Sequence, residues 1–487
     1  MYKVKYPFLA NLNLDNLVID KLTLHLNNLV KGNNLVLLTP IGEKVRPDVI
    51  LKEFDSIFNA PSNLALLDKD ILSIEMANRS KYGPRSISQP WLERKSSLLN
   101  YFANHKIGPD LLNYSVSSHD RFKLRPISYD MAIKTLKNST NSGLPFFTKK
   151  GLVKPLYASS SRSANTKSFY PSVLFTRTQE GNKTRDVWGY CMAATIFESR
   201  YYRPLLDYQK KLSWRSALLG PNDVDRRVTE LVNSSLLRGS YLLSIDFSKY
   251  DASISRKLIN YAFDYVKSLF QREFHNDIDV IRDFFYSGGI VTPDGVISGG
   301  HGVPSGSTFT NEVDSIVQYL ISTNSKYIFK ENMQIQGDDG VYCVSKDNVP
   351  YVFDSFTDQG LEVNKDKSII SDRYCTYLQK YYSPNYRNYD GLIGGIYPVY
   401  RALLRIVYQE RWTDFEDFGI LGKDYYSIRT ITILENCKHH PLFKELVQFV
   451  YSLDKYKLNY SQDGLNKYIS MLTETSGSEG FLFNQYG

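Results

Sequence analysis

The sequence predicts a mixed α+β fold, and three neighbouring segments in the middle of the chain support this prediction. Residues 241–245 (YLLSI) are apolar and β-prone. Residues 333–344 (MQIQGDDGVYCV) contain two β-prone runs joined by Gly-Asp-Asp-Gly, a composition typical of a hairpin turn. Between these segments, apolar residues recur at the spacing of one helix face, at Val313, Ile316, Val317 and Leu320.

The remaining elements follow in chain order. Residues 35–39 (LVLLT) predict a strand, and the charged region from about 48 to 105 predicts helices. Residues 172–179 (SVLFTRTQ) are again β-prone, after a polar, basic segment at 159–168 that we expect to be a mobile loop. From about residue 386 the pattern becomes mainly helical. The apolar face of this region includes Leu446, Phe449, Val450 and Leu453.

Composition narrows the class of protein. The chain has 487 residues and a mass of 56.0 kDa, which is enough for several subdomains. Lys and Arg number 59 against 51 Asp and Glu, and this net charge of +8 favours a polyanionic partner. The four cysteines show no CxxC spacing, which favours a reducing compartment over a disulfide framework. No apolar run is long enough to predict a membrane span, and no secretory signal is expected.

Acidic residues gather at the ends of the predicted central strands. Asp338 and Asp339 would lie at the tip of the hairpin, and Asp246 directly follows the strand at 241–245. If that strand lies beside the hairpin, the three carboxylates converge, and such oxygen ligands suit Mg²⁺ or Mn²⁺. This is the arrangement needed for two-metal phosphoryl transfer. An ordinary Asp-Gly turn and a helix N-cap at Asp246 are the simpler alternatives.

A glycine-rich loop lies between these acids. Gly299, Gly300 and Gly302 precede Pro304, and Ser305-Gly306 is expected to open the helix that continues through Val313. Such a loop before a helix N-terminus can approach a phosphate closely and offer free N–H groups to it. A mobile surface loop is the competing interpretation.

The order of these motifs resembles that of the viral RNA-dependent RNA polymerases, and most of all the picobirnaviruses, followed by the partitiviruses. Both groups have segmented double-stranded RNA genomes. The resemblance rests on seven segments: TNSGLP at 140–145 (motif G), RTQEGNKTRDVW at 177–188 (F), DFSKYD at 246–251 (A), PSGSTFTN at 304–311 (B), GDD at 337–339 (C), GLEVNKDKS at 360–368 (D) and YLQKYY at 377–382 (E).

The resemblance implies a right-hand polymerase with fingers, palm and thumb, closed by fingertips. The implied boundaries are an N-terminal region with the fingers at 1–240 and a first palm segment at 241–255. A fingers insertion at 256–300 and a second palm segment at 301–385 follow. The thumb and C-terminal tail would occupy 386–487.

The resemblance also implies roles for individual residues. Two Mg²⁺ or Mn²⁺ ions would be held by Asp246, Asp338 and Asp339, which are catalytic together with Lys367 as the proton donor to pyrophosphate. The implied nucleotide-binding residues are Asp251, Ser305, Gly306, Thr310, Asn311, Arg177, Lys183 and Arg185. The implied RNA-binding residues are Gly143, Pro145 and Lys380.

One departure from the family pattern concerns the residues that recognise the ribose 2′-hydroxyl of the incoming nucleotide. Asp251 can accept a hydrogen bond from a 2′-hydroxyl, directly or through Asn311, whereas reverse transcriptases place an aromatic residue at this point. Many relatives have an asparagine eight residues after the motif B glycine, and this chain has Asp314 there. Whether Asn311 or Asp314 partners Asp251 stays open.

The resemblance implies the partners as well. These are an RNA template and product, ribonucleoside triphosphates and a viral capsid protein, with no membrane span. The expected location is the virion interior and the host cell cytoplasm. Two other classes remain as alternatives. One is a reverse transcriptase-like enzyme, and the other is a non-catalytic RNA-binding or capsid-associated protein with a polymerase fold.

Overall fold

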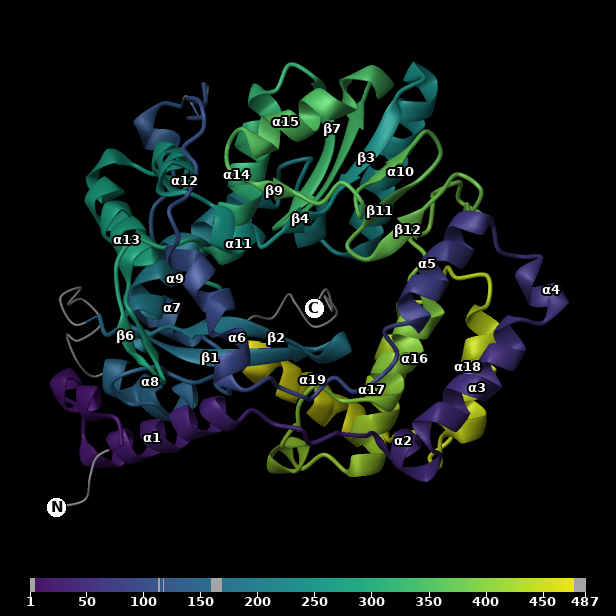
Figure 1. The fold of residues 1–487 in the computed structure, drawn as a ribbon, viewed down its shortest axis with the longest axis horizontal. Helices are drawn as coiled ribbons and strands as arrows, with labels where there is room; N and C mark the ends of the chain where they lie inside the picture. The colour runs from purple at the N-terminus through teal and green to yellow at the C-terminus, as the bar shows by residue number, and fades with distance from the viewer. Residues whose placement is uncertain (1–4, 113, 117, 159–168, 477–487) are drawn as a thin grey trace.

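A four-stranded antiparallel sheet forms the middle of the molecule, with strand order β10-β3-β8-β7. The computed structural model describes residues 5–112, 114–116, 118–158 and 169–476. The four strands are β3 (Tyr241–Ile245), β7 (Ile328–Gln336), β8 (Asp339–Val344) and β10 (Ile369–Ser371). The predicted strand and hairpin are therefore confirmed as neighbours (Figure 1).

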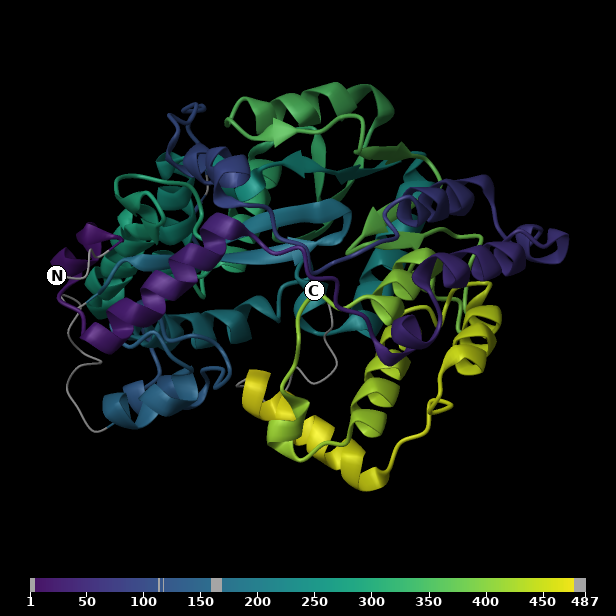
Figure 2. The ribbon, with the colours of Figure 1, turned by 60° about the horizontal axis from the view of Figure 1, so that its bottom comes forward.

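Successive side chains of a strand point to opposite faces of the sheet. In this sheet both faces are apolar, and helices cover both of them. Leu243 and Tyr342 pack in one core with α12 (Arg256–Leu269) and α14 (Thr310–Asn324). Leu242 and Cys343 point the other way and pack against α10 (Pro221–Arg238). A sheet buried on both faces explains why its strands read as nearly continuous apolar runs. Figure 2 shows α15 (Val349–Thr357) along the outer edge of this layer.

A second four-stranded sheet has the order β2-β1-β5-β6. Strand β1 (Ser172–Gln179) matches the β-prone segment in the sequence and forms a hairpin with β2 (Lys183–Gly189). Strand β5 (Ile290–Thr292) joins β1 in parallel and pairs with β6 (Gly295–Ile297). The predicted insertion at 256–300 thus contributes two strands to the sheet that carries motif F. The core around this sheet is completed by helices α1 (Asn16–Lys31), α6 (Trp91–Leu99), α8 (Lys150–Ala158) and α9 (Met192–Gln209).

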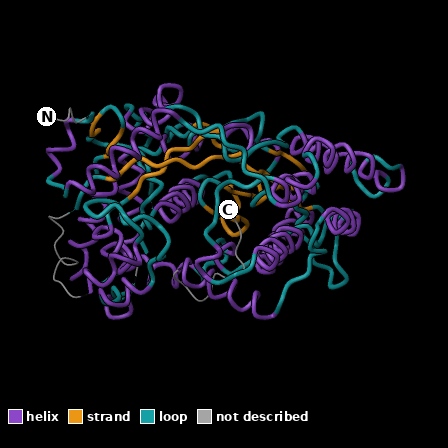
Figure 3. Tube along the Cα trace, turned by 90° about the horizontal axis from the view of Figure 1, so that it is seen from below, coloured by secondary structure: helices purple, strands orange, loops and turns teal. Residues whose placement is uncertain are grey.

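The C-terminal helices form a third layer together with part of the N-terminal region (Figure 1). Figure 3 shows helices around the strands of the molecule. Glu75 of α5 accepts hydrogen bonds from the backbone N–H groups of Val399 and Tyr400 at 2.8 and 3.2 Å, and from His440 at 2.9 Å. Part of the region 1–240 therefore packs with the predicted thumb. The helices of this layer are α2 (Pro40–Lys44), α3 (Pro47–Phe58), α5 (Lys69–Arg79), α16 (Val399–Val407), α17 (Gly422–Glu435) and α18 (Phe443–Leu453).

The remaining elements are short or peripheral. None of the described helices is both long and apolar enough to cross a membrane. The segment 159–168, predicted to be mobile, lies outside the described residues, as does the tail at 477–487. The other helices are α4 (Pro61–Leu64), α7 (Tyr129–Lys134), α11 (Tyr250–Ser253), α13 (His275–Ser287) and α19 (Gln462–Ser476), and the other strands are β4 (Phe247–Ser248), β9 (Glu362–Val363), β11 (Cys375–Tyr377) and β12 (Lys380–Tyr382).

Two element predictions were wrong. Residues 35–39 form no strand and make a single bridge, between Leu38 and Tyr408. The helix expected from Ser305 begins at Thr310, because the intervening backbone and hydroxyl groups bond to groups outside the helix. The helical predictions for 48–105 and for the region after 386 are confirmed, and the apolar face of α18 is buried as expected.

Candidate active site

The Gly-Asp-Asp segment forms the tip of the β7–β8 hairpin. Gln336 pairs with Asp339, so that Gly337 and Asp338 are the two turn residues. Gly337 has a φ of +63°, a conformation that favours glycine. Asp338 is exposed at the tip, and Asp339 begins strand β8 rather than sharing the turn as the sequence suggested.

Asp246 lies beside this tip because of the strand register. Ile245 pairs with Gly340, so the next residue on each antiparallel strand is Asp246 on one side and Asp339 on the other. Burial raises the pKa of Asp339 to about 7, and the charges of Asp338 and Asp246 add to this shift. Burial also raises the pKa of Asp246, where Lys367 opposes the shift and Asp338 adds to it. The three predicted carboxylates therefore lie within one another's electrostatic field.

Asp251 and Asp314 form a second pair of acids next to this group. Burial raises the pKa of Asp251 to about 7, with Asp338 adding to the shift and Arg185 opposing it. Burial and the charge of Asp251 raise the pKa of Asp314 well above its ordinary range. The amide oxygen of Asn311 instead accepts a hydrogen bond from Gln336 at 2.9 Å. Asp314 therefore lies in the electrostatic field of Asp251 and of Asp338, whereas Asn311 bonds to the hairpin strand.

Helix α14 holds the hairpin tip through side chains that the sequence analysis did not select. Ser315 Oγ accepts a hydrogen bond from the Gly337 N–H at 2.8 Å. Gln318 Nε2 donates to the Gly337 carbonyl at 2.9 Å, and Gln318 Oε1 accepts from Tyr342 Oη at 2.6 Å. The signal in the sequence was the polar series Asn311, Ser315 and Gln318, which lies at i, i+4 and i+7 and therefore on one face of the helix.

A buried ion pair supports the start of the same helix. Arg215 Nη2 lies 2.7 Å from Glu312 Oε1, and both side chains are almost completely buried. The same guanidinium lies 3.4 Å from Asn311 Oδ1. Arg215 was also absent from the sequence prediction, since no motif or periodic pattern around it indicates that this arginine is buried.

The predicted motif B residues form a loop that packs against strand β2. Ser305 Oγ donates to the Asp186 carbonyl at 3.2 Å. A Cβ atom on Gly306 would lie 1.5 Å from the Trp188 carbonyl oxygen, so only glycine fits there. Thr310 Oγ1 donates to the Pro304 carbonyl at 2.7 Å and thereby closes the loop on itself.

The predicted motif F residues lie on the β1–β2 hairpin. Arg177 and Arg185 are directly opposite each other across the two strands, and Lys183 is exposed nearby. Like charges in this position are unfavourable unless an anion lies between them. Arg177 is partly neutralised by Glu410, whose Oε1 is 3.1 Å from its Nε. The charge of Arg185 acts on Asp251, and Arg185 is the more available of the two arginines for a phosphate.

Lys367 lies in the turn between β9 and β10. Asn364 N–H donates to the Asp246 carbonyl at 2.8 Å, and the Asp246 N–H donates to Ser368 Oγ at 3.1 Å. These bonds fix the turn beside Asp246, and the charge of Lys367 opposes the rise in the pKa of Asp246. The structure thus brings the predicted proton donor to the carboxylate group.

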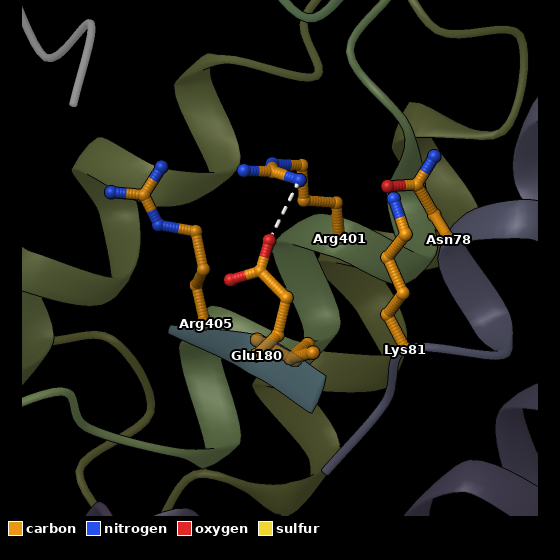
Figure 4. Close-up of a pocket in the computed structure, with 6 residues that line it drawn as sticks. Asn78, Lys81, Glu180, Arg401 and Arg405 are labelled. Atoms are coloured by element: carbon orange, nitrogen blue, oxygen red, sulfur yellow. Dashed lines mark ion pairs between the residues drawn. The ribbon is translucent and has the colours of Figure 1, made fainter. Parts of the chain in front are cut away.

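A second cluster of basic residues lies where the β1–β2 hairpin meets helix α16 (Figure 4). A cavity here is lined by Asn78, Lys81, Glu180, Arg401, Leu404 and Arg405. Burial lowers the pKa of Lys81, and the charges of Arg401, Lys183 and Lys367 contribute to the lowering. The positive field of motif F therefore extends from the carboxylates to the C-terminal helices.

The three residues predicted to bind RNA occupy different environments. Gly143 has a φ of +62°, and a Cβ atom there would lie 2.3 Å from the Tyr190 carbonyl oxygen. Pro145 is half-buried beside it. Lys380 is only 4% exposed, in strand β12. Its contact with RNA stays a prediction, and this burial leaves little of the side chain accessible to a nucleic acid strand.

Metal coordination by the carboxylates stays a prediction. Within the described residues, no three His, Cys, Asp or Glu side chains form a group that could hold a metal ion. The donor chemistry nevertheless fits a divalent cation, because oxygen ligands in one another's negative field are stabilised by positive charge.

Comparisons with known proteins agree with this geometry. The family model described as viral RNA-dependent RNA polymerase matches residues 104–393, which is more than half of the chain. The chain belongs to the viral RNA-dependent RNA polymerases. The match includes all seven motif segments, which lie between residues 140 and 382. The resemblance inferred from the sequence is therefore confirmed.

Individual relatives give the same result. The polymerase is 28% identical over 475 residues to a potential RNA-dependent RNA polymerase of a human picobirnavirus, covering 90% of this chain and 86% of the relative. It is 26% identical over 288 residues to the RNA-directed RNA polymerase of Cryptosporidium parvum virus 1, covering 53% and 54% of the two chains.

Solved structures confirm the predicted fold class. The crystal structure of a human picobirnavirus RNA-dependent RNA polymerase matches with a TM-score of 0.79 and 25% identity, over 99% of this chain and 94% of that one. Its insertion loop deletion mutant matches with a TM-score of 0.80 and 25% identity, over 97% and 95%. The polymerase has the right-hand fold, with mixed helices and strands. The exact boundaries of fingers, palm and thumb stay predictions.

Proposed function

We propose that this polymerase transfers ribonucleotides to a 3′-hydroxyl under the direction of an RNA template, by a two-metal mechanism. The observation that carries the proposal is the strand register that brings Asp246 beside Asp339 and the Asp338 turn. Carboxylates crowded in this way, with raised pKa values at Asp246 and Asp339, favour the binding of cations.

Asp246 and Asp338 would hold two Mg²⁺ or Mn²⁺ ions, with Asp339 in support. When bound, these ions lower the pKa of the attacking hydroxyl and neutralise charge on the departing pyrophosphate. Arg185 and Lys183 bind the triphosphate and orient it, and an arginine fork suits paired phosphate oxygens. Lys367 donates a proton to the leaving pyrophosphate from its turn beside Asp246.

Selection of ribonucleotides falls to the group around Asp251. Its carboxylate accepts a hydrogen bond from the ribose 2′-hydroxyl, a contact that a deoxyribonucleotide cannot make. Similarity to picobirnavirus polymerases supports a role in replication and transcription of a segmented double-stranded RNA genome. A capsid protein as partner, and activity inside the virion and in the host cytoplasm, belong to the same proposal.

The test is incorporation of labelled nucleotides by the purified protein on unprimed single- and double-stranded RNA. Reactions contain ribonucleotides or deoxyribonucleotides, with Mg²⁺, Mn²⁺ or a chelator. We expect ribonucleotide incorporation that requires a divalent ion. Efficient incorporation of deoxyribonucleotides would instead support a reverse transcriptase, and RNA binding without incorporation would support a non-catalytic protein.

A further inference from the structure

Glu198 on helix α9 is a buried carboxylate that lies outside the catalytic group. Only 2% of the residue is exposed. Its Oε1 accepts a hydrogen bond from Ser307 Oγ at 2.8 Å. Its Oε2 accepts from the Thr308 N–H at 2.9 Å and from Thr308 Oγ1 at 3.0 Å. A buried carboxylate is costly without such donors, and all three come from two consecutive residues of the motif B loop.

The other side of the same loop is fixed to strand β2. The Trp188 N–H donates to Ser305 Oγ at 3.4 Å, and Gly306 lies against the Trp188 carbonyl. The loop is therefore held from two directions, by β2 at residues 305–306 and by α9 at residues 307–308. Both supports lie in the region predicted to form the fingers, whereas the helix that follows the loop lies in the predicted palm.

The motif G segment reaches the same place. Gly143 lies against the carbonyl of Tyr190, two residues beyond the Trp188 carbonyl that contacts Gly306. Lys150 Nζ donates to Thr140 Oγ1 at 3.1 Å, and the charge of Lys150 acts on Glu198. Motifs G and B are thus both packed on the end of the motif F strand.

We propose that Glu198 is a positioning residue of the polymerase, which fixes the motif B loop so that helix α14 presents its first residues to the nucleotide. This inference rests on the proposed function. Helix α14 starts at Thr310, directly after the loop, and Ser315 on the same helix holds Gly337. Displacement of the loop would therefore disturb the nucleotide site and the Asp338 turn together.

The decisive variant is Glu198→Ala, which removes both acceptor oxygens and with them all three hydrogen bonds to the loop. We expect the Michaelis constant for ribonucleotides to rise about tenfold and turnover per active site to fall about tenfold, because misplaced binding groups impair positioning. Affinity for template RNA should change less than about twofold, since most of that affinity comes from contacts between basic side chains and RNA phosphates. Active-site titration separates these changes from a smaller fraction of folded enzyme.

Glu198→Gln is the conservative variant that should restore function. Its amide oxygen can accept from both Thr308 groups, and its amide nitrogen can donate to Ser307 Oγ. We expect its Michaelis constant to lie within about threefold of the unmodified enzyme. Ser199→Ala is the matched control, because Ser199 is buried on the same helix but bonds only to the Thr195 carbonyl at 2.7 Å.

If Glu198→Ala does not fold, Thr308→Val tests the same contact from the loop. It should raise the Michaelis constant for ribonucleotides, because valine cannot donate the hydrogen bond from Thr308 Oγ1 to Glu198, and an unchanged Michaelis constant would overturn the inference. An unchanged Michaelis constant in a folded Glu198→Ala enzyme would overturn it as well. If neither the unmodified enzyme nor Ser199→Ala incorporates ribonucleotides, the proposed function itself fails and this inference fails with it.

Discussion

The guanidinium of Arg401 lies 3.1 Å from the carboxylate of Glu180 and joins two parts of the chain that are far apart in sequence. Glu180 is at the tip of the β1–β2 hairpin, in the short helix η6 (Glu180–Asn182), and Arg401 is on α16. Each side chain is less than one fifth exposed. Arg85 approaches the same carboxylate at 3.8 Å. This contact connects the β1–β2 hairpin to helix α16, and so the predicted fingers to the predicted thumb (Figure 4).

Glu180→Gln is expected to loosen this closure. The substitution removes the negative charge among Arg85, Lys81 and Arg401, and we expect the free energy of unfolding to fall by about 2 kcal/mol, between the values for exposed and buried pairs. Urea unfolding measures the change, and shorter RNA products would report the weaker closure. Glu53→Gln on α3 loses the same charge at an exposed position and serves as control. Equal stability of the two variants would show that the pair contributes nothing.

Asp338→Ala is expected to abolish nucleotide incorporation while leaving RNA binding nearly unchanged. Loss of one ligand from the carboxylate group should lower turnover by about a thousandfold or more. A single-turnover assay and a filter-binding assay with the same RNA measure the two properties. Incorporation close to that of the unmodified enzyme would remove the assignment of the Gly-Asp-Asp turn.

Asp251→Ala is expected to weaken the preference for ribonucleotides over deoxyribonucleotides, by about tenfold or more. Single-nucleotide incorporation with each sugar measures the ratio. Asp314→Asn keeps the shape of its side chain while removing the ionisable group next to Asp251, and should leave the ratio within about threefold. If Asp314→Asn instead loses as much selectivity as Asp251→Ala, the ribose is read through residue 314.

Arg185→Ala is expected to raise the Michaelis constant for nucleotide about tenfold and to lower turnover, since a phosphate contact both binds and orients the substrate. Arg177→Ala removes the same charge from the opposite strand, but Arg177 is already paired with Glu410. Its effect should be smaller. Weakened template binding by Arg185→Ala, with an unchanged nucleotide dependence, would place Arg185 in the RNA channel.

The sequence predicted the parts of the site that depend on local pattern. The hairpin and the strand before Asp246 could be predicted from β-prone runs and a glycine turn, whereas their adjacency was only a condition of the hypothesis and is given by the strand pairing. Motif B also identified Gly306 as a functional position. The reason for glycine there, the close approach of the Trp188 carbonyl, is visible only in the structure.

The supporting contacts could not be predicted in this way, because they join residues that are distant in sequence. Gln318 bonds to Gly337 and Glu198 bonds to Thr308, and no periodicity identifies such partners. The burial of Lys380 was missed for the same reason, since a lysine in a basic chain is ordinarily exposed. The packing of α5 on α16 likewise depends on Glu75, whose N-capping role is visible only in three dimensions.

Glu198 also predicts a specific dependence of stability on pH. Burial raises its pKa in the folded protein to about 7, compared with an ordinary value of 4.5. Lys150 faces it and favours the charged form, while burial keeps Tyr190 and Cys191 neutral in this range. Between pH 4.5 and 7 the folded state therefore binds more protons at Glu198 than the unfolded state. The stabilisation of the folded state by proton binding to Glu198 is present in full below pH 4.5 and is lost as the pH rises through 7.

Glu198→Gln is consequently expected to gain stability relative to the unmodified enzyme as the pH rises. The amide cannot titrate, so the difference in the free energy of unfolding should shift towards the variant between pH 5 and 7.5, by at most about 3 kcal/mol. Urea unfolding at several pH values measures this difference. Ser199→Ala should show a difference that does not depend on pH. A constant difference for Glu198→Gln as well would mean that Glu198 keeps an ordinary pKa, and that its three hydrogen bonds fully offset the cost of burying its charge.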